Sequence, residues 1–266
     1  MQGVKFYRDE LLPFFELKVC NTAALSYKKH AHEEYSIGLI EQGRSCFWYE
    51  GKTETVDSDR MVLLPPGLVH ACNPMTPDNW CYIMLFVDAE WMKAFIGSRD
   101  EYSFDCPIIK SLSATDGLQR SKTLLATIKT CKSPLEKETN ILRLFEAALS
   151  GDKQTGGLDD LALFHNEPGV QRIREYLHDC FLEKVTLDQL AHVSGLNKFH
   201  VIRLFKAAYH IPPHAYQTLL RVNYAKNELR KKRRLIDVAT ASGFYDQSHF
   251  IKVFKSYTGV TPEQYQ

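Results

Sequence analysis

The C-terminal part of the chain contains two copies of one short sequence pattern. Ser194-Gly195 in the first copy matches Ser242-Gly243 in the second at an offset of 48 residues. Phe205-Lys206 matches Phe254-Lys255 at an offset of 49, so the second copy carries one extra residue. An amphipathic segment precedes each glycine and another follows it, which is the pattern of two helices joined by a tight turn. The repeat therefore predicts a pair of helix-turn-helix units.

Capping residues indicate where the helices of these units begin and end. Thr186 and Gln189 form a T-x-x-Q capping box at the start of the first unit. Gly195 permits the left-handed turn that ends this helix. The first unit is expected at about 186–207 and the second at about 235–256.

The outward side chains of each second helix are of the types that read DNA. A helix in the major groove needs Arg, Lys, Gln or Asn near its start to contact base edges, and cations to contact phosphates. The predicted outward side chains are Phe199, Ile202, Arg203 and Lys206 in the first unit, and Gln247, Ser248, Ile251, Lys252 and Lys255 in the second. Both sets contain this mixture, so double-stranded DNA is the predicted partner.

Charge is distributed unevenly along a chain whose net charge is only +1. Residues 166–266 contain 15 basic and 9 acidic residues, a net charge of +6, whereas residues 1–165 contain 18 and 23, a net charge of −5. A basic half favours a polyanionic partner. Between the two units one long helix is predicted at 216–230, and it ends in the basic run Arg230, Lys231, Lys232, Arg233 and Arg234. We expect this run to contact phosphates; the alternative is a solvated helix end that the helix dipole favours.

The segment 242–265 reads S-G-F-x-D-Q-S-H-F-x-K-V-F-K-x-Y-x-G-V-T-P-x-Q-Y and resembles the signature of the AraC/XylS family of transcription regulators. The resemblance covers about 100 residues, from roughly Pro168 to the end of the chain. It implies two helix-turn-helix units, joined by a long helix, that enter successive segments of the major groove. It places base contacts on Phe199, Ile202 and Arg203, and on Gln247, Ser248, Ile251 and Lys252. It also implies a homodimer, and RNA polymerase as a further partner.

The sequence departs from the family pattern at the end of the first unit. His210 stands where the family usually has Gly, and Pro212 replaces the usual Ser or Thr cap. We therefore expect a less regular exit from the first unit, and unequal contributions from the two units. Lys252 stands where Arg is common, and Lys cannot make the flat two-pronged contact to guanine, so this position is expected to contact phosphate more than base.

The N-terminal half is predicted to form a β-structure with two helices. Short strands rich in aromatic and branched residues are expected at 35–40, 45–49, 61–64 and 81–87, separated by turn residues. Closely spaced short strands suggest a barrel or a sandwich. Residues 117–149 change to a helical period and predict two amphipathic helices, which either pack on the barrel or form a dimer surface.

The predicted fold class is a two-domain α+β protein. A cupin-like β-barrel with two packed helices occupies 1–155, and serves in ligand binding and dimerisation. A polar, glycine-rich linker occupies 156–167. An all-α DNA-binding domain, with two helix-turn-helix units joined by a long helix, occupies 168–266.

Two histidine motifs in the N-terminal half resemble cupin motifs and the sensor domains of many AraC-type regulators. They are H-x-H at 30–32 and P-x-G-x-x-H at 65–70. The sub-group of sensors that this half resembles is often associated with amino-acid export or metabolism, which implies a small-molecule effector that is amino-acid-like. The ligand-binding candidates are His30, His32, Tyr35, Trp48, His70, Trp80 and Tyr82.

The three histidines His30, His32 and His70 are also candidate metal ligands. Enzymatic cupins add a Glu at a position that here falls on Ser36 or Ile37, and this missing carboxylate weakens an iron or manganese centre. We therefore expect a metal-free pocket, or structural histidines, and no cofactor.

The expected function is ligand-controlled transcription regulation rather than catalysis. The alternatives are a metal-dependent cupin enzyme with an accessory helical domain, and a constitutive DNA-binding protein whose barrel only dimerises. Seven scattered cysteines without a C-x-x-C pair favour reduced thiols in the cytosol over a disulfide framework. No run approaches 18 apolar residues, and the first residues lack the apolar stretch of a signal peptide, so we expect a cytoplasmic protein without a membrane partner.

Overall fold

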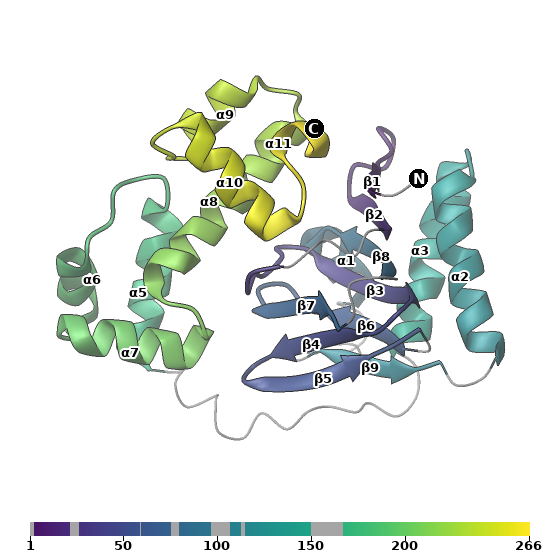
Figure 1. Cartoon of the computed structure of the whole chain (residues 1–266), viewed down its shortest axis with the longest axis horizontal. Helices are drawn as coiled ribbons and strands as arrows, with labels where there is room; N and C mark the ends of the chain where they lie inside the picture. The colour runs from purple at the N-terminus through teal and green to yellow at the C-terminus, as the bar shows by residue number, and fades with distance from the viewer. Residues whose placement is uncertain are drawn as a thin grey trace.

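The chain folds into a β-rich N-terminal part and a helical C-terminal part (Figure 1). The computed structural model describes residues 3–21, 27–58, 60–75, 80–96, 107–112, 115–149 and 167–266. The two-domain α+β fold class is therefore confirmed. Apart from its last residue, the expected linker at 156–167 lies outside the described residues.

The N-terminal part contains two antiparallel sheets. Among the described residues they do not close into the single ring of strands expected for a barrel, and the two sheets together are called the barrel below. The larger has the strand order β1-β2-β8-β3-β6-β9, and the smaller β5-β4-β7. The strands are β1 (Gly3–Tyr7), β2 (Phe15–Asn21), β3 (Tyr35–Gln42), β4 (Ser45–Tyr49), β5 (Lys52–Val56), β6 (Arg60–Leu64), β7 (His70–Pro74), β8 (Cys81–Val87) and β9 (Ile108–Ser111). The four predicted strands correspond to β3, β4, β6 and β8. The other five strands were not predicted, because they are more polar or lie outside the region of dense aromatic and branched residues.

Side-chain alternation divides the core of this part into two layers. Ile37 and Leu39 of β3 point to the outer face, where they join the apolar residues of α2 (Thr115–Thr130) and α3 (Pro134–Leu149). Ile40 points to the inner face, towards the smaller sheet. The two predicted helices thus pack on the larger sheet, on the side away from the helical domain (Figure 1). Ser133 caps α3, since its Oγ accepts from the Glu136 N–H at 3.3 Å. Helix α1 (Ala89–Ile96), which was not predicted, follows β8.

The helical part contains the two predicted helix-turn-helix units. Its helices are α5 (Pro168–Cys180), α6 (Leu187–Ser194), α7 (Lys198–Tyr209), α8 (Pro213–Arg230), α9 (Leu235–Ala241), α10 (Gln247–Thr258) and α11 (Pro262–Tyr265). Helices α6 and α7 form the first unit, α9 and α10 the second, and α8 joins them. The predicted capping box of Thr186 with Gln189 is present, and Gly195 adopts the left-handed conformation with φ 72°. Leu187 and Ile236, the apolar first residue of α6 and second residue of α9, are 38% and 56% exposed.

The exits from the two units have the same backbone. His210 has φ 57° and ψ 1°, and Gly259 at the matching position has φ 83° and ψ −6°. Pro212 and Thr261 then share φ −71°, with ψ 160° and 157°. The expected irregular exit of the first unit is therefore wrong for the backbone. The difference lies in capping, because Thr261 forms a capping box with Gln264 whereas Pro212 provides no side-chain cap.

The helices and the cysteines of the structure bear on the expected absence of a membrane partner and on the expected reduced thiols. Within the described residues, no helix combines the length and the apolar character needed to cross a bilayer. The described cysteines are free thiols, namely Cys20, Cys46, Cys72, Cys81, Cys131 and Cys180, while Cys106 lies outside the described residues.

Candidate functional site

The outward residues of α7 lie on an exposed face of the first unit. Asn197 caps this helix, with its Oδ1 accepting from the His200 N–H at 2.9 Å, and so fixes the first turn. Phe199 is 70% exposed, and the Arg203 guanidinium lies 5.9 Å from the centre of its ring. Ile202 is also exposed, at 40%, although it is apolar. An exposed aromatic and an exposed aliphatic beside an Arg suit contact with base edges and thymine methyl groups.

The outward residues of α10 form the matching face of the second unit. Asp246 caps the helix, with its Oδ1 accepting from the His249 N–H at 2.7 Å. Gln247, Ser248 and Lys252 are exposed, and Ile251 is half-buried. Lys206 and Lys255, near the ends of α7 and α10, are exposed as well. The structure thus brings each predicted set to one accessible helix face, and the role of these residues in DNA contact stays a prediction.

The basic run after α8 does not form one solvated patch. Arg230 points to the barrel, where its Nε lies 3.3 Å from a carboxylate oxygen of Glu16 and donates to the Tyr265 hydroxyl at 3.1 Å. Lys231 and Arg233 both pair with Glu228. Arg234 pairs with Asp237 at 2.8 Å. Lys231, Lys232, Arg233 and Arg234 remain exposed, so only Arg230 lies in a different environment from the one expected.

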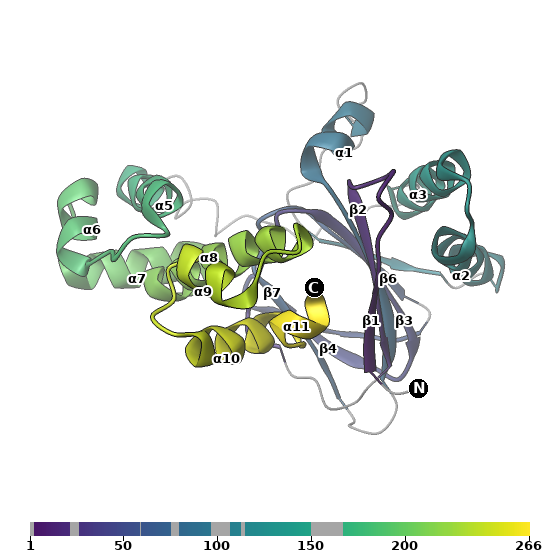
Figure 2. The same cartoon turned by 90° about the horizontal axis from the view of Figure 1, so that it is seen from above.

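A buried ionic network joins the helical part to the barrel. The Glu16 side chain is only 3% exposed and accepts from Arg8 Nε at 2.6 Å and from the Tyr265 hydroxyl at 3.1 Å, beside Arg230. Lys226 of α8 lies 3.2 Å from Glu34, which precedes β3. Burial alone would raise the pKa of Glu34, but Lys226 and Arg230 hold it below its ordinary value. These contacts attach α8 and α11 to the barrel (Figure 2).

A pocket of about 980 Å³, including its open mouth, lies between the two sheets and is closed partly by the helical part. Most of its lining is aromatic or aliphatic. From the barrel the lining includes Lys18, Tyr27, His30, His32, Phe47, Val62, Leu64, His70, Trp80, Tyr82 and Phe86, and from the helical part Leu219, Val222, Asn223, Lys226, Tyr257, Thr258 and Tyr265. A molecule in this pocket would therefore contact both domains.

Five of the seven predicted ligand-binding residues line this pocket, namely His30, His32, His70, Trp80 and Tyr82. Tyr35 and Trp48 do not belong to the lining. Tyr35 packs against the outer core under α2 and α3. Trp48 contacts the helical part, with its ring 5.4 Å from that of His210. Strand alternation decides these positions, and the inward face could not be determined from one sequence.

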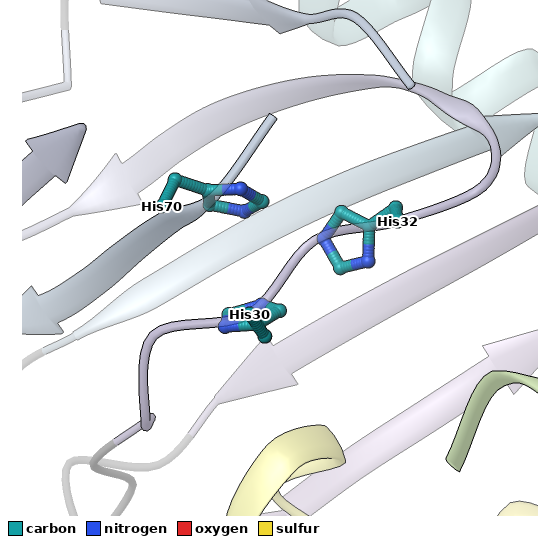
Figure 3. Close-up of side chains that lie close together, drawn as sticks. All are labelled: His30, His32 and His70. Atoms are coloured by element: carbon teal, nitrogen blue, oxygen red, sulfur yellow. The ribbon is translucent and has the colours of Figure 1, made fainter. Parts of the chain in front are cut away.

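The three histidines point toward one another (Figure 3). Their ring centres are 4.6 to 4.9 Å apart. His30 Nδ1 lies 2.7 Å from the Lys28 carbonyl, and His70 Nδ1 lies 2.9 Å from the Leu68 carbonyl. A carbonyl only accepts, so both Nδ1 atoms carry the proton. Burial lowers the pKa of His70 to about 4 and that of His30 well below its ordinary value, so both rings are neutral and leave Nε2 as a bare acceptor.

The same cluster is the candidate metal site among the described residues. One ring nitrogen from each histidine lies within 4.8 Å of the others. A tetrahedral ion with nitrogen ligands at about 2.1 Å needs those nitrogens about 3.4 Å apart, so the rings would have to move together. Burial, then the neighbouring histidines, and least the charges of Lys18 and Lys226 lower the pKa of His30 and His32, and the positive charge of the two lysines opposes a divalent cation.

Lys18 and Lys226 also line the pocket, and neither was predicted from the sequence to bind a ligand. Lys18 is buried, and its Nζ donates to the Tyr27 hydroxyl at 3.1 Å and to the Thr258 carbonyl at 2.9 Å, both neutral oxygens. Burial lowers the pKa of Lys18 to about 8, although Cys20 and Glu16 oppose the shift. A lysine inside a strand gives no sequence signal that it will line a pocket. One of its two hydrogen-bond partners, Thr258, lies 240 positions further along the chain.

Two family profiles match the chain. Residues 21–147 match an AraC-like ligand-binding domain, and residues 190–266 match a helix-turn-helix domain. The HTH-type transcriptional regulator YbfI of Bacillus subtilis is 30% identical over 227 residues, which cover 84% of this chain and 81% of YbfI. The probable transcriptional regulator LumQ of Photobacterium leiognathi is 26% identical and covers 91% of this chain and 92% of LumQ.

Solved structures of ToxT from Vibrio cholerae share the fold. One has a TM-score of 0.56 at 14% identity and covers 94% of this chain and 97% of ToxT. Another, of ToxT bound to an unsaturated fatty acid, has a TM-score of 0.57 at 13% identity and covers 94% of each chain. These matches support the two-domain architecture, and the names of the relatives describe regulators of transcription rather than enzymes.

Proposed function

This chain belongs to the AraC family of transcription regulators, and from that premise we propose that one small molecule, bound between the barrel and α8, controls how its two helix-turn-helix units engage DNA. One observation carries the proposal: the pocket takes its polar groups from both domains, with Lys18 and three histidines from the barrel and Lys226 from α8. A ligand that touches both domains stabilises one relative arrangement over another, which is what control by an effector requires.

The DNA contacts are assigned to the exposed faces of α7 and α10. Base contacts come from Phe199, Ile202 and Arg203, and from Gln247, Ser248, Ile251 and Lys252. Phosphate contacts come from Lys206, Lys255, Lys231, Lys232, Arg233 and Arg234. Arg230 is left out of this set, because its guanidinium is held between Glu16 and Tyr265 while the domains are docked.

Arg203→Ala and Gln247→Ala are each expected to weaken the cognate DNA site by about 1–3 kcal/mol while sparing non-specific binding. The reason is that both side chains are exposed on a predicted recognition helix, Gln247 at its first residue and Arg203 in its middle, and hold no buried group in place. Fluorescence anisotropy on cognate and random duplexes measures both quantities. Equal losses on the two duplexes would contradict a reading role. Lys232→Ala is the matched control, and it should weaken both duplexes alike and flatten the salt dependence.

The effector class that the pocket fits best is an amino acid with an apolar side chain. Its ammonium group would donate to the bare Nε2 acceptors of the histidine cluster, which face the pocket from one side. Its carboxylate would accept from Lys18 and Lys226, and the aromatic and aliphatic wall would hold its side chain. Lys18 supports an anionic group, since it is a buried cation whose hydrogen bonds among the described residues go to two neutral oxygens.

Calorimetric titration with phenylalanine or leucine is expected to show binding, and each single-ended analogue should bind at least about tenfold more weakly. The analogues for phenylalanine are phenethylamine, which lacks the carboxylate, and 3-phenylpropanoate, which lacks the ammonium group. An unsaturated fatty acid is included because ToxT has been solved with one. Binding of the fatty acid with no response to amino acids would replace the proposed effector class. If DNA affinity is the same with and without every bound ligand, the control function itself fails.

The same proposal includes the other expected partners of the protein and the limits of its domains. The protein acts in the cytoplasm as a homodimer and contacts RNA polymerase. Its sensor domain occupies 1–155, the linker 156–167 and the DNA-binding domain 168–266. Dimerisation would raise DNA affinity through the effective concentration of the second protomer. Size-exclusion chromatography with light scattering, with and without DNA, measures the number of protomers.

A further inference from the structure

One side chain of α8 contacts the main chain of the α5–α6 turn, which leads into the first helix-turn-helix unit, and the main chain of the second unit. The Arg221 guanidinium donates from Nε to the Phe181 carbonyl at 2.7 Å and from Nη2 to the Glu183 carbonyl at 2.8 Å. Its Nη1 donates to the Gly243 carbonyl at 2.7 Å. Phe181 and Glu183 lie in the turn that leads into α6 of the first unit, and Gly243 lies in the turn between α9 and α10 of the second. All three guanidinium nitrogens therefore join the α5–α6 turn, which precedes the first unit, to the second unit.

The two turns also touch each other around this arginine. Gly243 has φ +74°, and a Cβ added there would lie 2.7 Å from the Leu182 carbonyl oxygen and 3.1 Å from the guanidinium carbon of Arg221. Gln217, one helical turn before Arg221, donates from Nε2 to the Phe181 carbonyl at 3.1 Å and to the Glu183 carbonyl at 2.8 Å. The turn between α9 and α10 thus packs directly against the turn between α5 and α6, with no room for a side chain between the two turns.

We propose that Arg221 is a positioning residue that fixes the distance and angle between α7 and α10, and thereby the spacing of the two DNA elements that the protein accepts. The inference rests on the proposed function, since it concerns how two DNA-reading helices are held. Apolar packing of each unit against α8 is not directional and tolerates small rotations. A planar guanidinium with three carbonyl partners is directional, because hydrogen bonds weaken steeply when their angles change.

DNA geometry makes the spacing sensitive to such a rotation. One added base pair moves the second element by about 3.4 Å along the axis and rotates it by about 34°. Two recognition helices held rigidly cannot follow that change, whereas two loosely held ones can. The structure therefore predicts narrow spacing for the native chain and broad spacing once the three-carbonyl contact is lost.

Binding-site selection from random duplex DNA tests the inference with the full-length chain. The native protein should enrich two short elements at one spacing, with a one-base-pair insertion weakening binding about tenfold or more. Arg221→Lys retains the charge but cannot reach three carbonyls, and it should enrich the same two elements over several spacings, with less than about threefold discrimination. Gly243→Ala is a second variant, because its Cβ would press on the Leu182 carbonyl and on the guanidinium, which pushes the two turns apart while the arginine charge is kept.

Arg172→Lys is the matched control. Arg172 donates to the Val193 carbonyl at 3.0 Å and the Ser194 carbonyl at 2.7 Å, both inside the first unit. This variant should keep the native spacing even where it lowers affinity. An Arg221→Lys protein that keeps one sharp spacing, or that loses affinity equally at all spacings, overturns the inference. A native protein that enriches only one element overturns it too, whereas enrichment of no DNA at all refutes the proposed function instead.

Discussion

Glu16→Ala is expected to lower the free energy of unfolding by about 3–5 kcal/mol, the loss found when one member of a buried ion pair is removed. The carboxylate is almost fully buried and contacts Arg8, Arg230 and Tyr265. Without this carboxylate, the guanidinium groups of Arg8 and Arg230 stay partly buried with less negative charge beside them. Only Arg230 then keeps another described carboxylate partner, Glu34 at 3.3 Å. Urea unfolding followed by fluorescence and circular dichroism measures the change.

Glu10→Ala is the matched control for Glu16→Ala, because Glu10 is exposed and comes from the same N-terminal part. A loss below about 1 kcal/mol for Glu16→Ala would show that the network adds little to domain docking, as is common for exposed pairs. The double variant with Arg230→Ala separates the pair interaction from the cost of a leftover charge. If the variant undocks the domains, Arg230 becomes available to phosphate, and the salt slope of DNA binding should steepen by about one contact.

Lys18→Met is expected to stabilise the ligand-free protein. Burial lowers the pKa of Lys18 to about 8, from 10.5, so keeping the charge at pH 7 costs about 3 kcal/mol. Loss of the hydrogen bonds to Tyr27 and Thr258 offsets about 1 kcal/mol each, which leaves a net gain of about 1–2 kcal/mol. Thermal unfolding at pH 7 measures the gain, with Lys132→Met in the exposed turn between α2 and α3 as the control.

The same lysine predicts a pH dependence with a definite sign. Its pKa is lower in the folded chain than in the unfolded chain, so the unfolded chain binds more protons between about pH 8 and 10. The native protein should therefore become more stable relative to Lys18→Met as the pH rises through that window. A stability difference between the two proteins that does not change with pH would contradict the assignment of a charged, buried Lys18.

Lys18→Met should also weaken an anionic effector by about tenfold to a hundredfold, since a hydrogen bond to a charged group contributes about 1.5–3 kcal/mol. The variant is thus expected to be more stable and less responsive. Unchanged binding of phenylalanine or leucine would remove Lys18 from the effector site. Such a trade is typical of binding sites, where a group that costs stability in the free protein is retained for the ligand.

The sequence predicted the helical domain in detail because its determinants are local. The Thr186–Gln189 box and the left-handed Gly195 act within three or four residues, and the structure has both. The irregular exit expected at His210 was wrong, because the tertiary fold holds a histidine in the left-handed conformation that Gly259 adopts in the second copy. The exposed DNA-facing residues were predicted from helical period alone, and their roles await the binding experiments.

Only the tertiary structure decided the sensor side of the molecule. The sequence pointed to three histidines, but Tyr35 and Trp48 proved to lie outside the pocket because strand facing depends on how the two sheets pack. Glu16 and Arg230 are 214 residues apart, and no periodicity or spacing links them. The sequence by itself therefore determined two helix-turn-helix units, whose caps and turns are local. The structure decided what holds those helices together and what a ligand can touch, because those contacts join distant segments whose proximity exists only in the fold.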